Sequence, residues 1–175
     1  MAETEFRRPI RLDTLGDAAR SLAVAAEPLE REALARRFGL LALDMLEAEL
    51  TLSRDGDVVT LSGRLRARAT QACVASGVPV PATIDEPIAL LFRPEPAASK
   101  PDEETELDEA DMDVLFHDGA AIDLGEAVAQ SLLLALDPYP RAPDAETALK
   151  AAGVKSETEV GPFAALAALK GKPGN

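Results

Sequence analysis

A short acidic stretch holds the side chains that could do metal chemistry. It places three carboxylates around the only histidine of the chain, in the order Asp111, Asp113, His117, Asp118. Carboxylates and imidazole can share Mg²⁺ or Mn²⁺, and a metal-dependent hydrolase is the reaction class that such a site would serve. The order matches no EF-hand loop, however, and the chain supplies no second histidine. We therefore expect no bound metal and no cofactor.

Covalent catalysis would need a nucleophile with a base in reach, and Cys73 with His117 is the only pair of cysteine and histidine. Cys73 ends an alternating strand on its apolar face, which predicts a buried structural thiol. His117 is expected at the end of a strand. The sequence contains no phosphate-binding glycine loop, no dinucleotide-binding glycine motif, no HExxH and no GxSxG. The residues therefore indicate a protein that is not an enzyme.

Three arginines, Arg64, Arg66 and Arg68, recur at every second position and must share one face of a strand. Such a row could bind RNA phosphates, but it is also typical of the solvated side of a strand. Glu47 and Glu49 are candidate partners on the neighbouring strand. A net charge of −13 disfavours a large nucleic-acid footprint. Direct RNA binding through these arginines is therefore the alternative hypothesis.

The acidity of the chain is local. Between Asp102 and Glu126 there are eleven Asp and Glu residues and no Lys or Arg, so the rest of the chain keeps 20 acids against 18 bases. This block runs directly into an apolar helix, and charge beside hydrophobic surface favours docking of a basic partner at rates that fall with salt. The candidate partner-binding residues are Asp111, Asp113, Asp118, Asp123 and Glu126.

The first half of the chain predicts an edge strand, a helix and a hairpin. Residues 6–12 are extended, and a helix over 28–38 has Pro28 at its first position and Gly39 after its end. Alternation over 46–53 and 59–69, joined by Asp55-Gly56, predicts a hairpin that buries one face. A third strand is expected over 82–92, with Pro87 at a bulge or an edge.

The second half predicts a disordered acidic loop at 95–109, followed by weaker elements. The segment 112–117 and Ala121-Ile122, joined by Asp118-Gly119, predict a second hairpin. Asp123 and Glu126 have capping-box spacing at the start of a helix that ends near Asp137. The remaining expectations are a short helix over 144–152, an apolar stripe over 162–169 that docks on the sheet, and a flexible tail at 171–175.

Together these elements predict one α+β domain over residues 1–170. Its antiparallel sheet is open or closed into a barrel, with a few short helices packed on it. A single cysteine excludes an intramolecular disulfide, and no export signal or membrane-spanning run is present. We therefore expect a cytoplasmic protein that contacts no membrane and takes no small-molecule substrate.

The order and spacing of several segments resemble the YceD family, the bacterial and plastid large ribosomal RNA subunit accumulation proteins. No single segment is a catalytic fingerprint, and the resemblance depends on their combination. The segments are Arg-Pro-Ile-Arg-Leu at 8–12, Arg-Glu-Ala-Leu-Ala-Arg-Arg-Phe at 31–38, Gly-Arg-Leu-Arg-Ala at 63–67 running into Cys73-Val74, Leu-Phe-Arg-Pro at 91–94, Phe116 to Glu126, Leu132 to Arg141, and Pro-Phe-Ala at 162–164.

The resemblance implies a non-enzymatic role in accumulation of the large-subunit ribosomal RNA, and hence in ribosome assembly. It supplies no catalytic residue. The expected partner is a basic ribosomal protein or a large-subunit assembly intermediate, with ribosomal RNA as the alternative. Many members have a second cysteine soon after the first, and some have a further pair, a pattern that suggests a metal site. Here Ala75, Ser76 and Gly77 follow Cys73-Val74, so no zinc function carries over.

Overall fold

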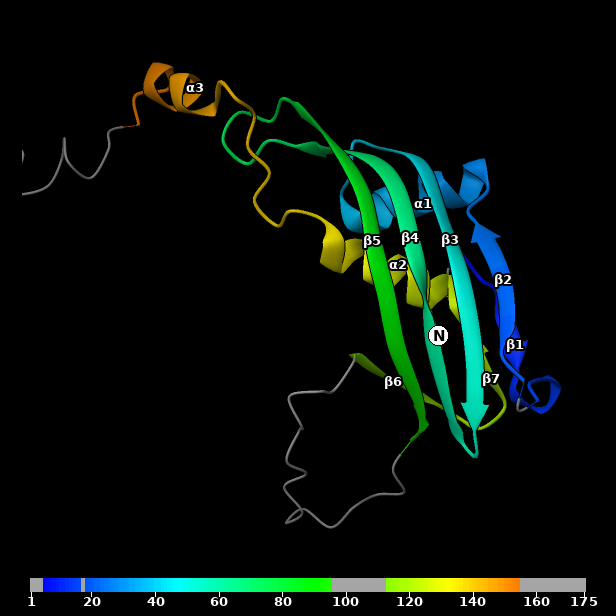
Figure 1. Cartoon of the computed structure of the whole chain (residues 1–175). Helices are drawn as coiled ribbons and strands as arrows, with labels where there is room; N and C mark the ends of the chain where they lie inside the picture. The colour runs from blue at the N-terminus through cyan, green and yellow to red at the C-terminus, as the bar shows by residue number, and fades with distance from the viewer. Residues whose placement is uncertain (1–4, 17, 96–112, 155–175) are drawn as a thin grey trace, which may run out of the picture. The chain divides into compact units, whose positions relative to one another are not determined.

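The computed structural model describes residues 5–16, 18–95 and 113–154 of the chain (Figure 1). Contacts divide the chain into two units, Met1–Gln71 with Pro81–Asp137, and Ala72–Val80 with Pro138–Asn175. The elements in order are β1 Pro9–Arg11, a 3₁₀ turn Leu12–Thr14, β2 Arg20–Ala25, α1 Pro28–Phe38, β3 Ala42–Asp55, β4 Val58–Ala72, β5 Pro79–Pro94, β6 Asp113–His117, β7 Ala121–Asp123, α2 Leu124–Ala135 and α3 Ala145–Ala151.

The first unit is built on a sheet with the strand order β2-β3-β4-β5-β6, beside a small sheet of β1 and β7. The five-stranded sheet is open within the described residues, because β2 and β6 are its two edges. Both α1 and α2 lie on the same side of it (Figure 1). The α+β prediction is confirmed, in its open form.

The long hairpin of β3 and β4 is the centre of this sheet. The turn at Asp55-Gly56 gives Gly56 a φ of 58°, and the two strands pair from Asp55–Val58 to Ala42–Thr70. The inward positions predicted from alternation are buried. They supply Leu46, Ala48, Leu50 and Leu52 from β3, and Val59, Leu61, Leu65, Ala67 and Ala69 from β4.

The predicted helix over 28–38 is confirmed as α1, with Pro28 in its first turn. Glu27 and Glu30 form a reciprocal capping box, in which each side chain accepts from a backbone N–H of the other end of the first turn. Gly39 ends the helix in the left-handed conformation, with φ 66°. The helix buries Leu34 and Ala35 against the sheet core.

The predicted second hairpin is wrong. Asp118 accepts from Ala120 N and Gly119 has φ 86°, so the turn forms, but the strands on either side do not pair with each other. β6 pairs parallel with β5, and β7 pairs antiparallel with β1. A lone two-stranded hairpin is marginal in water, so each short strand gains more by joining a strand that already has a packed face. The main sheet is therefore mixed.

α2 supplies the other half of the core. It buries Leu124, Ala127, Val128, Ala129 and Leu132 on the sheet, and its capping residue Leu136 is also buried. The helix begins after Asp123 and ends at Ala135, just before the predicted stop. No helix among the described residues is long and apolar enough to cross a membrane.

In the second unit, α3 falls within the predicted short helix over 144–152, and a small cluster buries Cys73, Ala142 and Ala145. Three predictions lie outside the described residues in whole or in large part: the disordered loop at 95–109, the apolar stripe at 162–169 and the tail at 171–175. The single domain over 1–170 also stays a prediction.

Candidate functional site

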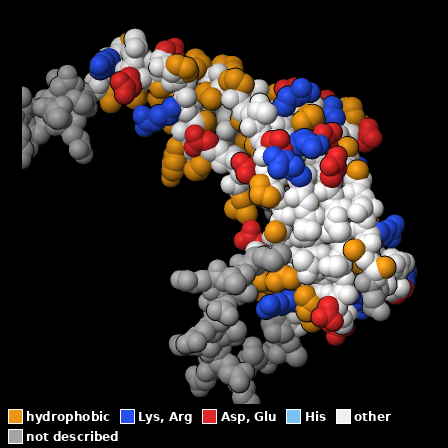
Figure 2. All heavy atoms as spheres, viewed as in Figure 1, with side chains coloured by type: hydrophobic (Ala, Val, Ile, Leu, Met, Phe, Trp, Pro, Cys, Tyr) orange, Lys and Arg blue, Asp and Glu red, His pale blue; other side chains and the backbone are white. Residues whose placement is uncertain are grey.

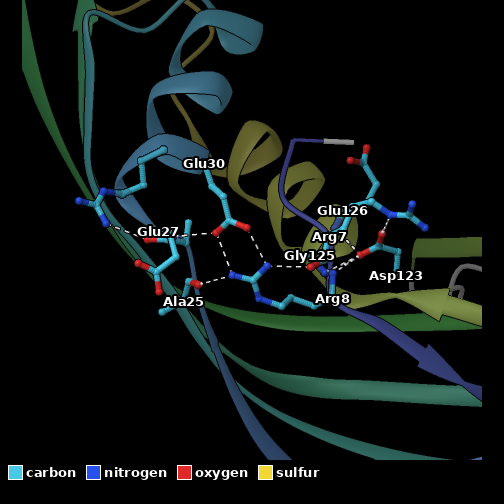
Figure 3. Close-up of polar contacts among 10 residues, drawn as sticks. Arg7, Arg8, Ala25, Glu27, Glu30, Asp123, Gly125 and Glu126 are labelled. Carbon is cyan, nitrogen blue, oxygen red and sulfur yellow. Dashed lines mark hydrogen bonds and ion pairs between the residues drawn. The ribbon is translucent and has the colours of Figure 1, made fainter. Parts of the chain in front are cut away.

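The start of α2 gathers charged side chains from three separate parts of the chain (Figure 3). Asp123 is the N-cap, and its Oδ1 accepts from Gly125 N at 3.0 Å and Glu126 N at 3.3 Å. The same oxygen accepts from Arg8 N at 2.8 Å, and Oδ2 lies 3.4 Å from Arg7 Nε. One carboxylate thus caps the helix and fixes the N-terminal segment across it.

Glu126 is held by a bidentate ion pair. Its two carboxylate oxygens accept from the guanidinium of Arg37 at 2.6 and 2.8 Å, and Gln130 Nε2 donates to one of them at 3.0 Å. The hydrogen bond from Arg37 lowers the pKa of Glu126 below its ordinary value, although burial opposes it. Arg37 comes from the last turn of α1, so this pair joins the two helices.

A second bidentate pair joins the N-terminal segment to the first turn of α1. Arg8 donates to both oxygens of Glu30 at 2.8 Å and to Ala25 O at 3.0 Å. Its guanidinium also stands 4.7 Å from the centre of the Phe6 ring. The pairing with Arg8 lowers the pKa of Glu30. Each oxygen of this network therefore has a partner within the protein.

Gly125 lets the N-terminal segment lie directly on α2. A Cβ at this position would be 2.2 Å from Phe6 O and 3.1 Å from Arg8 N. No side chain fits in that space, so glycine is required by close approach and not by its backbone angles. Phe6, which is fully buried, is thereby held against the core.

This network contains residues that the sequence analysis did not identify as site residues. Arg8 and Glu30 were not singled out as site residues, although the segments Arg-Pro-Ile-Arg-Leu at 8–12 and Arg-Glu-Ala-Leu-Ala-Arg-Arg-Phe at 31–38, which include or adjoin them, were part of the family resemblance. The pairing could not be found from spacing, because Arg8 and Asp123 are 115 positions apart. Asp123 and Glu126 lie together as predicted, but their carboxylates are used inside the protein.

The other predicted partner-binding acids lie elsewhere. Asp113 is exposed at the start of β6 and Asp118 is exposed at the turn that follows, while Asp111 is outside the described residues. Phe116, between them in sequence, is 61% exposed. Backbone hydrogen bonds from Ala120 and Ala121 lower the pKa of Asp118, which keeps it ionised. β6 and the turn after it therefore expose two acids and one aromatic ring.

The strand arginines alternate with buried residues of β4, so they lie on the face of the sheet that points away from the core. Figure 2 shows basic and acidic side chains intermixed on part of the surface in this view. Arg64 pairs with Asp85 at 2.5 Å, and Arg66 lies 3.5 Å from Glu49 and 3.9 Å from Glu47. Among the described residues, Arg68 makes no ion pair. Acids therefore offset two of the three positive charges on this face.

His117 is 6% exposed and uses both ring nitrogens. Gly119 N donates to Nδ1 at 3.1 Å, so the ring proton is assigned to Nε2, which donates to Asp57 O at 2.9 Å. This imidazole ties β6 to the tip of the β3–β4 hairpin. The described residues contain no group of three His, Cys, Asp or Glu side chains that could hold a metal ion.

Cys73 is buried, as predicted, and its sulfur accepts from Ala142 N at 3.3 Å. This hydrogen bond, with a smaller contribution from the Ser76 hydroxyl, lowers the pKa of the thiol to about 7. Ser76 Oγ is buried without a hydrogen bond of regular geometry among the described residues. The backbone N–H of Ala142 is therefore the main cause of the lowered pKa. The Cys73 side chain links two segments of the second unit.

Comparison with protein families places the chain in a class of ribosome-related factors. A family model described as large ribosomal RNA subunit accumulation protein YceD matches residues 61–170, which is more than half of the chain. The chain belongs to this family. The match includes α2, whereas the N-terminal segment and α1 that complete its ion-pair network precede it. Comparisons with curated proteins and with solved structures found no match.

Proposed function

We propose that this protein promotes accumulation of the large-subunit ribosomal RNA as a non-enzymatic assembly factor that binds a basic ribosomal protein or an assembly intermediate. Family membership supports the role, because the family is described by rRNA accumulation and not by a reaction. In a bacterial cell, such a role places the protein in the cytoplasm.

The exposed acidic surface of β6 carries the proposal for the partner. Asp113 and Asp118 lie on either side of exposed Phe116 in the sequence, and neither acid pairs with a cation among the described residues. Arg and Lys bind carboxylates through charge and stack on aromatic rings. A basic protein segment meets both requirements, whereas RNA phosphates would be repelled. Because their charges are offset by Asp85, Glu47 and Glu49, the strand arginines favour RNA binding less.

Affinity purification of the full chain at low and high salt, with and without nuclease, tests this proposal. We expect large-subunit proteins to remain after nuclease treatment and to be lost at high salt. Asp113→Lys combined with Asp118→Asn should reduce their recovery. The asparagine keeps an acceptor for Ala120 N, so the turn survives. Replacing Arg64, Arg66 and Arg68 by Gln is the matched control, because it changes charge at the strand arginines and leaves β6 intact.

Two results would overturn the proposal. Complete loss of partners after nuclease, together with loss in the arginine variant, would favour direct RNA binding. Unchanged recovery in both variants would show that neither surface makes the contact.

A further inference from the structure

A groove lies between β5 and the C-terminal half of α2, and its lining combines apolar side chains with polar surface, the charged side chains being two acids. It encloses about 410 Å³. The helix reaches the outer side of β5 at this end (Figure 1). Its lining includes Glu86 and Leu90 from β5, Asp113 from β6, and Leu134 from α2.

Two adjacent leucines of α2 are exposed at this end of the helix. Leu134 is 74% exposed and its neighbour Leu133 is 49% exposed, while Leu132 is completely buried. Strand β6 covers β5 only from Leu90 to Pro94, so among the described residues the outer edge of β5 before Leu90 has no strand beside it. Leu134 therefore lies beside an uncovered edge.

The charges of the groove are both negative and have a defined spacing. Asp113 pairs in register with Leu90, and Glu86 lies four residues earlier on β5. Four residues of extended chain span about 13 Å, so the two carboxylates lie at about that distance along the strand direction. Glu86 also occupies a position that shares its face with the buried side chains of Ile84 and Ile88.

Neither groove acid forms an ion pair with a described residue. Asp85 is the main cause of the raised pKa of Arg64, and Glu86 adds a smaller, longer-range contribution. The groove thus holds two carboxylates without a bound counter-charge beside exposed leucine. Its chemistry is complementary to a chain that carries cations at both ends and apolar side chains between them.

We propose that this groove binds an extended basic segment of the partner, with two cations about four residues apart and an apolar side chain against Leu134. The inference rests on the proposed function, since it specifies how the basic partner is held. It adds an apolar anchor to the acidic surface of β6. Binding that depended on charge alone would not need Leu134.

Titration of the ¹⁵N-labelled full chain with synthetic peptides tests the groove directly. The main probe has two lysines four positions apart with two leucines between them. One control peptide replaces the leucines by serine, and another replaces the lysines by serine. We expect chemical-shift changes at 86–90 and 131–135 with the main probe, and binding at least about tenfold weaker for each control peptide.

Variants of the protein then separate the contribution of the apolar side chain of Leu134 from that of the acidic side chains. Leu134→Glu should weaken binding of the main probe by about tenfold or more. Glu86→Lys should also weaken binding, and the loss should be larger at low salt than at high salt, because salt screens the interaction between charges. Leu29→Glu is the matched control, because Leu29 is 78% exposed on α1, away from the groove. Glu32→Lys on the same helix controls for the change of net charge.

Equal binding of the leucine-free peptide, shifts confined to other residues, or no effect of Leu134→Glu would overturn the groove. Self-association through Leu134, seen by sedimentation of wild type against Leu134→Glu, would assign the groove to a second copy instead. If wild type recovers large-subunit proteins but Leu134→Glu recovers them equally, the groove fails while the proposed function stands. If wild type recovers none although the peptide binds, the proposed function fails and the groove stands.

Discussion

The two halves of α2 differ in whether their charged and apolar side chains have partners within the protein. At its N-terminal end, Asp123 and Glu126 are bonded to Arg7, Arg8 and Arg37, and the N-terminal segment covers the helix. At its C-terminal end, Leu133 and Leu134 are exposed beside acids that have no described ion-pair partner. This contrast shows that a cluster of acidic residues in the sequence does not by itself identify a binding surface.

The presence of ion-pair partners within the protein separates the two cases. Carboxylates at the start of a helix are stabilised by its free N–H groups and by nearby guanidinium groups, so they contribute to folding. Carboxylates on an edge strand without such partners contribute little to stability and remain available to another molecule. We therefore assign Asp123 and Glu126 mainly to the stability of the fold, whereas the proposed recognition residues are Asp113 and Glu86.

The largest effect that this comparison predicts is at Gly125. In Gly125→Ala the new Cβ would meet Phe6 O, so the N-terminal segment must move away and Phe6 must lose contacts. Overpacking of this kind costs about 3 kcal/mol of the free energy of unfolding. Chemical denaturation of the full chain measures it.

Gly16→Ala is the control for Gly125→Ala, since a Cβ at Gly16 has no atom within 4 Å and no positive φ is involved. We expect it to change stability by less than about 0.5 kcal/mol. If the two alanine variants were equally stable, the N-terminal segment would not pack on the start of α2, and the difference between the two halves of the helix would lose its main support.

A smaller effect is expected from the pair of Arg37 and Glu126. A double-mutant cycle with Arg37→Met and Glu126→Gln should give a coupling free energy of about 1 kcal/mol, because the geometry is bidentate but the pair is partly exposed. In the other half of the helix, Leu134→Gln should change stability by less than about 0.5 kcal/mol. A coupling near zero, or a large loss at Leu134, would reverse the roles given to the two ends.

The sequence predicted the local elements of this fold well. The hairpin of β3 and β4, the caps of α1 and the stop of α2 each depend on residues close together in the chain, such as Asp55-Gly56 and Gly39. Alternation on β3 and β4 also identified their buried faces. Periodicity and turn chemistry act over a few residues, so they are readable without a structure.

Long-range pairing was not predicted. β6 pairs in parallel with β5, and β7 pairs with β1. The choice of partner depends on which strand edges the rest of the fold leaves free, and the sequence of a short strand does not specify it. The same limit explains why Arg8 and Glu30 were missed. Asp123 and Glu126 were found by their spacing, but only the fold shows that their partners are internal.

The smallest predicted effect concerns how the free energy of unfolding changes at acidic pH. The pKa of Glu126 is lowered from its ordinary value of 4.5 in the folded protein, mainly by Arg37. Its contribution to stability is therefore complete above pH 4.5 and is lost as the pH falls through the folded pKa. The difference in the free energy of unfolding between wild type and Glu126→Gln should therefore become steadily smaller below that pH.

Denaturation of both proteins at pH values from 7 down to 3 checks this expectation. Arg37→Met should show the same narrowing relative to wild type, because it removes the cause of the shift, whereas Glu30 keeps its own acid dependence in every variant. A gap that stayed constant would mean that the ion pair does not stabilise the charged form of Glu126. The carboxylate would then be available to a partner, as we propose for those of Asp113 and Glu86, and the contrast between the two ends of α2 would be lost.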